Sequence, residues 1–372
     1  MKVLFVVPRY HTNMIGWIKA LKSIGCEVEV NAIIKGKTEN YTELHPQIFE
    51  LSSLSRLIMK LLGEGGTNQP RGFPRIFKYF SALKKSRPDI IVVRDITRWF
   101  SFMAAIYGRL LGIKVIIYSQ LTMHTYYTEK RRKTINWANK FFNSFWMTPI
   151  RGEANIKEVL PEKLVYIPLV VDINKSQNQH LSNIPRLLTI GKFVERKKHL
   201  LLLAALKNLK ARGFKFELTI VGEISSALHE SNYAKVVSFI EENNMTGDVN
   251  IKVNVPHENI GEIFAASDLF ILPATNEPAG VSVLEAMAYS LPVICSTTCG
   301  TQWYIKHGQT GYIFKDESIN DLEESLIWFF DYTDKAQLYK NCLLNAEDEI
   351  SGAKFLELFN KSLKAYFDIS LN

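Results

Sequence analysis

The stretch from residue 270 to residue 294 reads FILPATNEPAGVSVLEAMAYSLPVI, and it decides the fold class. An apolar run from Leu269 to Leu272 is typical of a buried strand, and Pro273 ends it. A polar loop follows, and a helix is predicted from about Ser282 to Tyr289. A second buried strand begins at Pro292. This order of strand, loop, helix and strand predicts an α/β fold.

Two glutamates flank the start of this helix. Glu277 lies in the loop and Glu285 inside the helix, with seven residues between them. Gly280 would let the backbone pass close to a ligand. The first amides of a helix have no partner within it, and the positive end of the helix dipole suits a phosphate. The layout therefore predicts a site that grips both ends of a phosphate-bridged molecule by their hydroxyls.

A structural interpretation competes with this one. Ser282 and Glu285 have the spacing of a capping box, in which Glu285 only closes the start of the helix. The two glutamates by themselves leave both interpretations open.

The whole stretch resembles the E-x7-E signature of retaining glycosyltransferases of the GT-B fold, family-four type. The match covers Glu277-Pro-Ala-Gly280-Val, Glu285-Ala-Met-Ala288 and Pro292-Val-Ile. Ala279 replaces the family's aromatic residue, and Ser290 replaces its glycine. The resemblance implies an α/β protein with two Rossmann-like domains facing a cleft, the GT-B architecture. It also implies transfer of a sugar from a nucleotide diphosphate sugar to an acceptor hydroxyl with retention of configuration, in cell-surface glycan or polysaccharide synthesis.

The resemblance gives roles to individual residues. Glu277 would hold hydroxyls of the donor sugar, and Glu285 would hold the ribose. Lys192 and Lys197 stand where the family's G-R-L-x-x-x-K segment has the two cations that hold the donor diphosphate, and with Glu277 they form the expected catalytic set. Gln120 stands where the family has a histidine that contacts the donor sugar. The other expected donor-binding residues are Pro278, Ala279, Gly280, Val281, Ser282 and Gly222.

The chain also begins with a Rossmann-like half. A buried strand is predicted from Lys2 to Val7, and the loop after it holds His11, Thr12 and Asn13. Arg94 ends a later buried strand. Because the carboxyl ends of parallel strands line the ligand crevice in such folds, these four polar residues are expected on the acceptor side. A lone loop histidine can equally be simply solvated.

Three parts of the chain are expected. They are an N-terminal acceptor-side domain (residues 1–172), a C-terminal nucleotide-sugar donor domain (173–352) and a final helix (353–372) that packs back on the first domain. The polar, Asn- and Gln-rich residues 172–185 are predicted to be the linker. Within the first domain, a helix is predicted from Asn136 to Trp146.

The charge of the chain is unevenly spread. Residues 1–172 carry 26 basic and 13 acidic side chains, and residues 173–372 carry 19 and 24, so the net charges are +13 and −5. The first half is therefore expected to face something anionic. A lipid-linked glycan acceptor at an anionic membrane surface fits, with contact from Leu51–Leu62, Arg75–Lys85 and Lys130–Lys133. Alternatively, the bases keep the protein soluble and the Leu51–Leu62 face packs into the core.

Other properties of the sequence limit the classes of function that it can have. No apolar run reaches membrane-spanning length, and the N-terminus does not read as a signal peptide, so we expect a cytoplasmic protein, peripheral on the inner face of the membrane. The four cysteines form no zinc pattern, and no Asp-x-Asp metal motif occurs. No nucleic-acid-binding module accompanies the basic charge. We therefore expect no metal, no nucleic acid partner, and no cofactor besides the nucleotide sugar.

Other functions of the same fold class remain open on the sequence. Gln120, Ser290 and Trp303 depart from the family's pattern, which keeps open a catalytically inactive partner subunit that only binds a nucleotide. A nucleotide-sugar epimerase of the GT-B fold would need an acid/base pair that the chain does not display. A phosphorylase of the glycogen type would need a cofactor lysine and a much longer chain.

Overall fold

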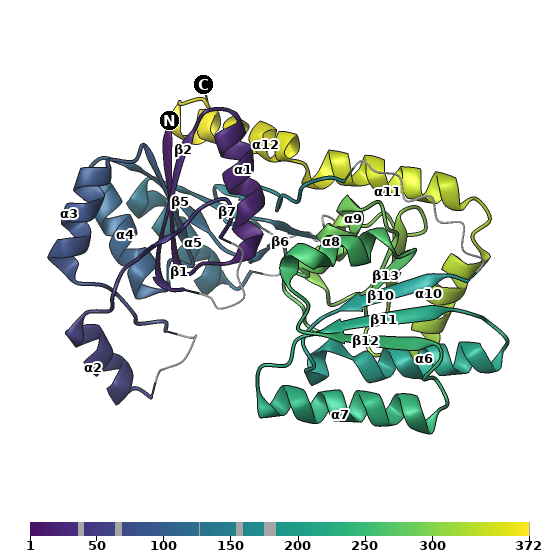
Figure 1. Ribbon diagram of the computed structural model, residues 1–372. Helices are drawn as coiled ribbons and strands as arrows, with labels where there is room; N and C mark the ends of the chain where they lie inside the picture. The colour runs from purple at the N-terminus through teal and green to yellow at the C-terminus, as the bar shows by residue number, and fades with distance from the viewer. Residues whose placement is uncertain (36–40, 64–68, 126, 154–158, 175–183, 372) are drawn as a thin grey trace. The chain divides into compact units, whose positions relative to one another are not determined.

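The computed structural model describes residues 1–35, 41–63, 69–125, 127–153, 159–174 and 184–371. The chain divides into two compact units (Figure 1). Unit 1 comprises Met1–Val170 and Gly352–Asn372, and unit 2 comprises Val171–Ser351. These limits differ by one or two residues from the boundaries expected after residues 172 and 352. Most of the predicted linker, residues 175–183, lies outside the described part of the chain.

Unit 2 is built on a parallel sheet. Its strands are β10 (Arg186–Ile190), β11 (Glu217–Gly222), β12 (Val249–Val253), β13 (Leu269–Leu272), β14 (Val293–Ser296) and β15 (Gly311–Phe314). They lie in the order β12-β11-β10-β13-β14-β15, and each neighbouring pair is parallel. The order therefore reverses between β10 and β13. In open α/β sheets, ligands bind beyond the carboxyl ends of the strands at such a reversal.

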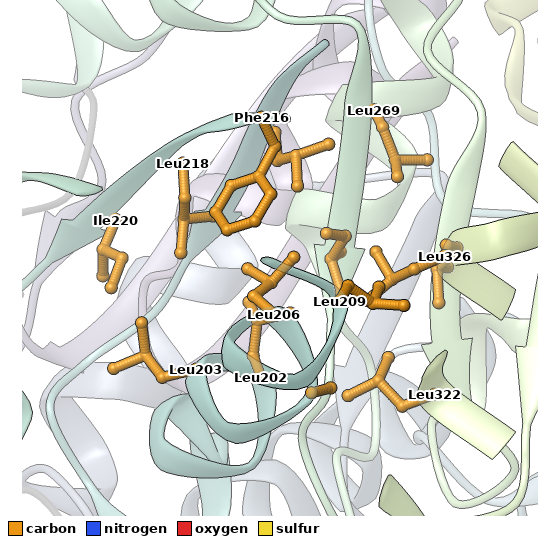
Figure 2. Packing of buried hydrophobic residues seen from close by; sticks show 14 of the residues in the cluster. Leu202, Leu203, Leu206, Leu209, Phe216, Leu218, Ile220, Leu269, Leu322 and Leu326 are labelled. Carbon is orange, nitrogen blue, oxygen red and sulfur yellow. The ribbon is translucent and has the colours of Figure 1, made fainter. Parts of the chain in front are cut away.

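Helices lie on both faces of this sheet (Figure 1). They are α6 (His199–Ala211), α7 (Ala227–Glu242), α8 (His257–Ala265), α9 (Val281–Ala288), α10 (Ile319–Asp331) and α11 (Lys335–Ile350). Leu202, Leu206 and Leu209 recur on one side of α6 at helical spacing. They are fully buried in one cluster with Leu218 of β11 and Leu322 of α10 (Figure 2). Truncating one such leucine to alanine costs about 2–5 kcal/mol, so this core holds the strand ends firmly.

Unit 1 is built on a second parallel sheet. Its strands are β1 (Lys2–Arg9), β2 (Glu27–Ile34), β3 (Gln47–Ile48), β4 (Ile90–Arg94), β5 (Lys114–Tyr118), β7 (Phe145–Thr148) and β9 (Leu164–Tyr166). They lie in the order β3-β2-β1-β4-β5-β7-β9, which reverses between β1 and β4. A separate pair is formed by β6 (Thr122–His124) and β8 (Ile150–Gly152). The helices are α1 (Ile15–Ser23), α2 (Ser53–Leu61), α3 (Ile76–Ser86), α4 (Trp99–Leu110), α5 (Glu129–Phe142) and α12 (Gly352–Phe367).

The final helix, α12, belongs to unit 1 although it follows the whole of unit 2 in the sequence. It packs on α1, where the ring centroids of Phe355 and Trp17 lie 6.0 Å apart in a stacked arrangement. The indole nitrogen of Trp17 also donates a hydrogen bond to the carbonyl of Pro168 at 2.7 Å. Helices from the first and the last part of the sequence, α1 and α12, therefore pack together in unit 1.

The basic run Lys130–Lys133 lies in the first turns of α5, and the prediction of a helix from Asn136 to Trp146 is wrong at both ends. The hydroxyl of Thr128 accepts a hydrogen bond from the backbone nitrogen of Arg131 and caps the helix well before the predicted start. Asn143 takes the left-handed conformation, with a φ of 48°, and ends the helix, so Trp146 lies in β7.

Ser290, which stands at the family's glycine position, follows α9 in the left-handed conformation, with a φ of 63°. Its side chain is buried, and its hydroxyl has no hydrogen-bond partner among the described residues. A backbone position with φ in this region favours glycine, because the Cβ of any other residue crowds the backbone there. The departure from the family's pattern at this position is therefore a source of strain.

We expect the substitution Ser290→Gly to stabilise the protein by about 1 kcal/mol. The left-handed conformation costs a non-glycine residue about 1–2 kcal/mol, and the greater chain entropy of glycine offsets only part of that gain. Ser290→Ala is the matched control, because it removes the hydroxyl and keeps the Cβ. Melting temperatures measure the effect, and a glycine variant that melts no higher than the alanine variant would contradict it.

Candidate functional site

Two loops of unit 2 meet where the order of the strands reverses. One loop follows β10 and runs from Gly191 to Lys198, and the other follows β13 and runs from Pro273 to Gly280. The backbone nitrogen of Thr275 in the second loop donates a hydrogen bond to the carbonyl of Arg196 in the first, at 2.8 Å. The reversal therefore brings together two segments that lie about 80 residues apart in the sequence.

A buried cluster of charges joins these loops. One carboxylate oxygen of Glu277 accepts a hydrogen bond from the Nζ of Lys197 at 2.7 Å and another from the guanidinium of Arg196. The side chains of Glu277 and Lys197 are only 10% and 11% exposed, whereas that of Arg196 is 47% exposed. Burial by itself would raise the pKa of Glu277, but the charges and hydrogen bonds of Lys197 and Arg196 outweigh it and hold that pKa below its usual value. The carboxylate is therefore ionised at neutral pH, and the cluster keeps a net positive charge.

Gly191, at the start of the loop after β10, leaves space for the side chain of Lys197. A Cβ on Gly191 would lie 2.9 Å from the Cδ of Lys197, so a larger residue there would displace the lysine stem. A Cβ on Gly222 would lie 2.0 Å from the ring of Phe193, which is fully buried. Gly222 therefore has a packing role, whereas the family resemblance places it among the donor-binding residues.

Lys192, the second cation expected at the diphosphate, has a different partner. Its Nζ lies 3.1 Å from a carboxylate oxygen of Glu223, and its side chain is about half exposed. Burial would raise the pKa of Glu223, but the Ser225 hydroxyl and Lys192 lower it overall. Both predicted lysines therefore lie in the loop after β10, but of the two only Lys197 contacts Glu277.

Arg196 is a site residue that the sequence interpretation does not assign. It is one of four neighbouring bases between Lys192 and Lys198, and the spacing of the resembled motif selects other members of that run. The structure turns Arg196 and Lys197 toward the same carboxylate through a short 3-10 helix, η2 (Glu195–Lys197). Lys198 then takes the left-handed conformation, with a φ of 51°, before α6 begins.

The helix after Glu277 starts one residue earlier than predicted. Gly280 is the N-cap of α9, and no side chain caps the helix. The capping-box interpretation is therefore wrong, because Ser282 lies inside the first turn. The amides of Val281 and Ser282 have no partner within the helix, as in any first turn. Gly280 has a negative φ of −72°, and a Cβ there would lie 2.7 Å from Leu272, so the structure requires glycine for packing.

Glu285 lies one turn into α9 and is partly exposed. Its carboxylate oxygen lies 3.2 Å from the Nε2 of His257, the first residue of α8. Between the two glutamates, Pro278 is exposed and Ala279 is partly buried. The two carboxylates therefore stand on either side of the uncapped helix start, one in the loop and one on the helix.

The residues expected on the acceptor side lie at the carboxyl ends of strands in unit 1. His11 is the N-cap of the 3-10 helix η1 (Thr12–Met14), which includes Thr12 and Asn13 and follows β1. Arg94 ends β4, the strand across the reversal from β1, and Gln120 follows β5.

Asp95, which the sequence interpretation does not assign, follows Arg94 in the left-handed conformation, with a φ of 52°. Burial raises the pKa of Asp95, although the nearby charges of Arg94, Arg98 and His11 oppose the shift. The Asp95 side chain is 37% exposed and lies 3.7 Å from the Nε of Arg94, so a partly buried carboxylate with a left-handed backbone stands at the reversal of this sheet.

Metal-ligand clusters and membrane-spanning helices are both lacking in the described part of the chain. Neither unit, in its described ranges, brings three or more His, Cys, Asp or Glu side chains together as metal ligands are. Among the helices described, none combines the length and the apolar composition that crossing a bilayer requires.

Residues 171–346 match the family of glycosyl transferases group 1. The chain is also similar to the UDP-Gal:alpha-D-GlcNAc-diphosphoundecaprenol alpha-1,3-galactosyltransferase of Escherichia coli. The two are 21% identical over 379 residues, which cover 93% of this chain and 90% of that enzyme.

Solved structures share the fold. The glycosyltransferase from Rickettsia africae ESF-5 is 19% identical, with a TM-score of 0.72 over 99% of this chain and 98% of that one. The Anabaena protein HepE in complex with UDP and glucose is 15% identical, with a TM-score of 0.71 over 98% of this chain and 100% of that one. The fold is that of the GT-B glycosyltransferases, as the resemblance implies. Residues 171–346, nearly all of unit 2, therefore match glycosyl transferases group 1, and the whole chain is similar to glycosyltransferases.

The lowered pKa of Glu277 predicts how the stability of the protein depends on pH. A carboxyl group with a lowered folded-state pKa stabilises the fold fully above its unfolded pKa of about 4.3, and this contribution is lost as the pH falls through the lower folded pKa. The wild type should therefore melt above the Glu277→Gln variant at pH 7, and the gap should close in acid below pH 4. Glu242→Gln, an exposed change on α7, should show no such gap. A gap that stays constant down to pH 3 would contradict the ionised cluster.

Proposed function

We propose that the protein is a glycosyltransferase that moves a sugar from a nucleotide diphosphate sugar to an acceptor hydroxyl with retention of the anomeric configuration. The observation that carries the proposal is the charge cluster of buried Glu277 and Lys197 with half-exposed Arg196, beside the uncapped start of α9. The cluster lies in the unit that matches the family. Its position at the reversal of the sheet is where nucleotides bind in this class of fold.

The main chemical requirement of the reaction is that the nucleoside diphosphate leaves the sugar. The bond between the anomeric carbon and the phosphate oxygen breaks, and its electron pair stays on the diphosphate. The acceptor oxygen bonds to the same carbon, and its proton is released with the nucleoside diphosphate. Negative charge therefore grows on the leaving group, where fixed cations and amides stabilise it without reorganising. Lys197, Arg196 and the amides of Val281 and Ser282 would supply them, with Lys192 as a further cation.

The two glutamates would position the ends of the donor. Glu277 stays ionised at neutral pH, so its carboxylate can accept hydrogen bonds from the hydroxyls of the donor sugar. Glu285, beyond the helix start, would accept hydrogen bonds from the ribose. Because the cations can neutralise the diphosphate, we propose that the reaction needs no metal, and activity should persist when divalent cations are chelated.

The acceptor is proposed to be a lipid-linked glycan used for cell-surface polysaccharide. The name of the Escherichia coli relative contains a diphosphoundecaprenol acceptor, which is a lipid diphosphate. The net charge of +13 on residues 1–172 would suit such an anionic molecule. The protein would then work in the cytoplasm at the inner face of the membrane, where the acceptor is presented.

A panel of nucleotide sugars tests the reaction itself. An active enzyme should release the nucleoside diphosphate from one donor of the panel, and NMR of the glycosylated product should show the anomeric configuration of that donor. A protein that only binds nucleotides, one of the alternatives, would raise its melting temperature with a nucleotide and release none. An inverted product would overturn the proposal of retention.

We expect Lys197→Met to lower turnover about a hundredfold or more with the donor found in the panel, because it removes one fixed cation beside the leaving diphosphate. Lys198→Met is the matched control. It removes the same charge from the next residue, whose amine pairs with Glu317 at 2.5 Å instead. Initial rates at saturating donor measure the effect. Equal rates for the two variants would show that Lys197 does not act on the diphosphate.

Glu285→Gln should weaken nucleoside diphosphate binding about tenfold or more, because hydrogen bonds to a charged acceptor are worth about 1.5–3 kcal/mol. The melting temperature without ligand should barely move, since Glu285 does not cap α9. The control is Glu258→Gln, an exposed change on α8 near His257. Titration calorimetry measures the affinities, and an unchanged affinity would remove Glu285 from the ribose.

A further inference from the structure

One surface of unit 1 has a composition unlike the rest of the chain. Residues 51–63 and 69–88 carry eight basic side chains and no acidic one. Four of the bases, Arg56, Lys60, Arg75 and Lys78, belong to α2 and the start of α3 and are exposed. The exposed carboxylate of Glu50 lies beside Arg75 and Lys78, but the four bases outnumber it, so this surface has a positive potential.

The same surface exposes large apolar side chains. On α2, Leu54, Leu57 and Leu61 recur at helical spacing along one side, and Leu62 follows as the C-cap; each of the four is between 54% and 75% exposed. Phe77, in the first turn of α3, is 87% exposed, and its neighbour Ile76 is 45% exposed. Scattered exposed leucines are ordinary, but a row of them on one helix marks a contact surface.

The leucines are exposed because another side of α2 is already fixed to unit 1. The hydroxyl of Ser55 donates to the carbonyl of Arg71 at 3.2 Å and accepts from the backbone nitrogen of Phe73 at 3.1 Å. Met59, one turn on, is buried. The alternative in which the Leu51–Leu62 face packs into the core is therefore wrong for these four leucines, and Figure 1 shows α2 standing apart from the helices that cover the sheet.

The start of α3 belongs to the same surface. The backbone nitrogen of Ser52 donates to the carbonyl of Phe73 at 2.9 Å, and Leu51 forms an antiparallel bridge with Pro74. These contacts hold the beginning of α2 beside the segment that leads into Ile76 and Phe77. We call the exposed apolar residues of α2, together with Ile76, Phe77 and the four bases, the α2–α3 surface.

We infer that the α2–α3 surface docks on an anionic lipid bilayer. A helix with an apolar row on one side and bases on another lies in the boundary between head groups and acyl chains, where both kinds of side chain are satisfied. A second copy of the chain would bring the same bases against these and repel them. A nucleic acid would neutralise the bases and leave the leucines in water.

Docking of the α2–α3 surface would form the membrane contact that the proposed function implies. It rests on the proposed function only for the lipid-linked acceptor. The basic run of α5 contributes less, because Lys133 is paired with Glu129 at 2.6 Å. Vesicle binding needs neither donor nor acceptor, so a failure of docking would leave the transfer reaction to be judged by the nucleotide-sugar panel.

Co-sedimentation of the full chain with vesicles tests the inference. Binding should require phosphatidylglycerol in phosphatidylcholine vesicles and fall steeply as salt rises, because the Debye length shrinks from about 10 Å at 0.1 M to about 3 Å at 1 M. Equal recovery with neutral and anionic vesicles at low salt would overturn it.

Matched variants separate the two kinds of contact. Each base near an anionic surface is worth a factor of about five in affinity, so Lys60→Gln with Lys78→Gln should weaken binding about 25-fold. The controls are Lys207→Gln with Lys235→Gln, which remove two exposed bases from unit 2. If the two pairs of variants bind anionic vesicles alike, the effect belongs to net charge and the assigned surface is wrong.

The leucines need their own test. Leu57→Gln with Leu61→Gln should weaken binding about tenfold or more at unchanged charge, while Leu228→Gln, at a 65% exposed leucine of α7, should not. All four native cysteines are buried, so Leu61→Cys can be labelled selectively with an environment-sensitive dye. A blue shift with anionic vesicles is expected. A shift that depends on protein concentration without lipid would point to a second copy and overturn the inference.

Discussion

A buried carboxylate and its two cations are the interaction on which the second unit's site depends. Glu277 lies almost wholly out of water, and an ionised group in that position must be paired to be tolerated. Lys197 and Arg196 pair with it from the loop after β10, while the carboxylate itself comes from the loop after β13. The cluster therefore fixes the two loops at the reversal of the sheet, and it sets cations beside the helix start before any ligand arrives.

Local patterns in the sequence predict much of this site. The strand, the loop and the helix of residues 269–288 occur within one or two residues of their predicted positions, because apolar runs and helix-start signals are short-range features. The sequence does not predict Arg196, since the turn of η2 decides which of four bases faces the carboxylate. The capping box also fails, because Gly280 is the N-cap and Ser282 lies inside the first turn.

In unit 1, sequence patterns do not predict which helix faces are covered by other elements. Periodicity identifies the apolar row of α2, but it does not tell whether another element covers that row. The structure leaves it uncovered because Ser55 and Met59 fix a different side of the helix. Asp95 is likewise recognised only from its left-handed backbone and its place at the reversal of the sheet. We propose a division of labour in which unit 2 holds the donor by charge and the α2–α3 surface of unit 1 brings the enzyme to a lipid-linked acceptor.

A crystal structure of the protein with a nucleoside diphosphate tests most directly whether the Glu277 cluster and the start of α9 hold the donor. We predict that the terminal phosphate lies within hydrogen-bond distance of the Nζ of Lys197 and of the backbone nitrogens of Val281 and Ser282. The ribose hydroxyls should lie within the same range of the carboxylate of Glu285. A nucleotide bound elsewhere, with the Glu277 cluster untouched and the start of α9 free, would contradict this assignment.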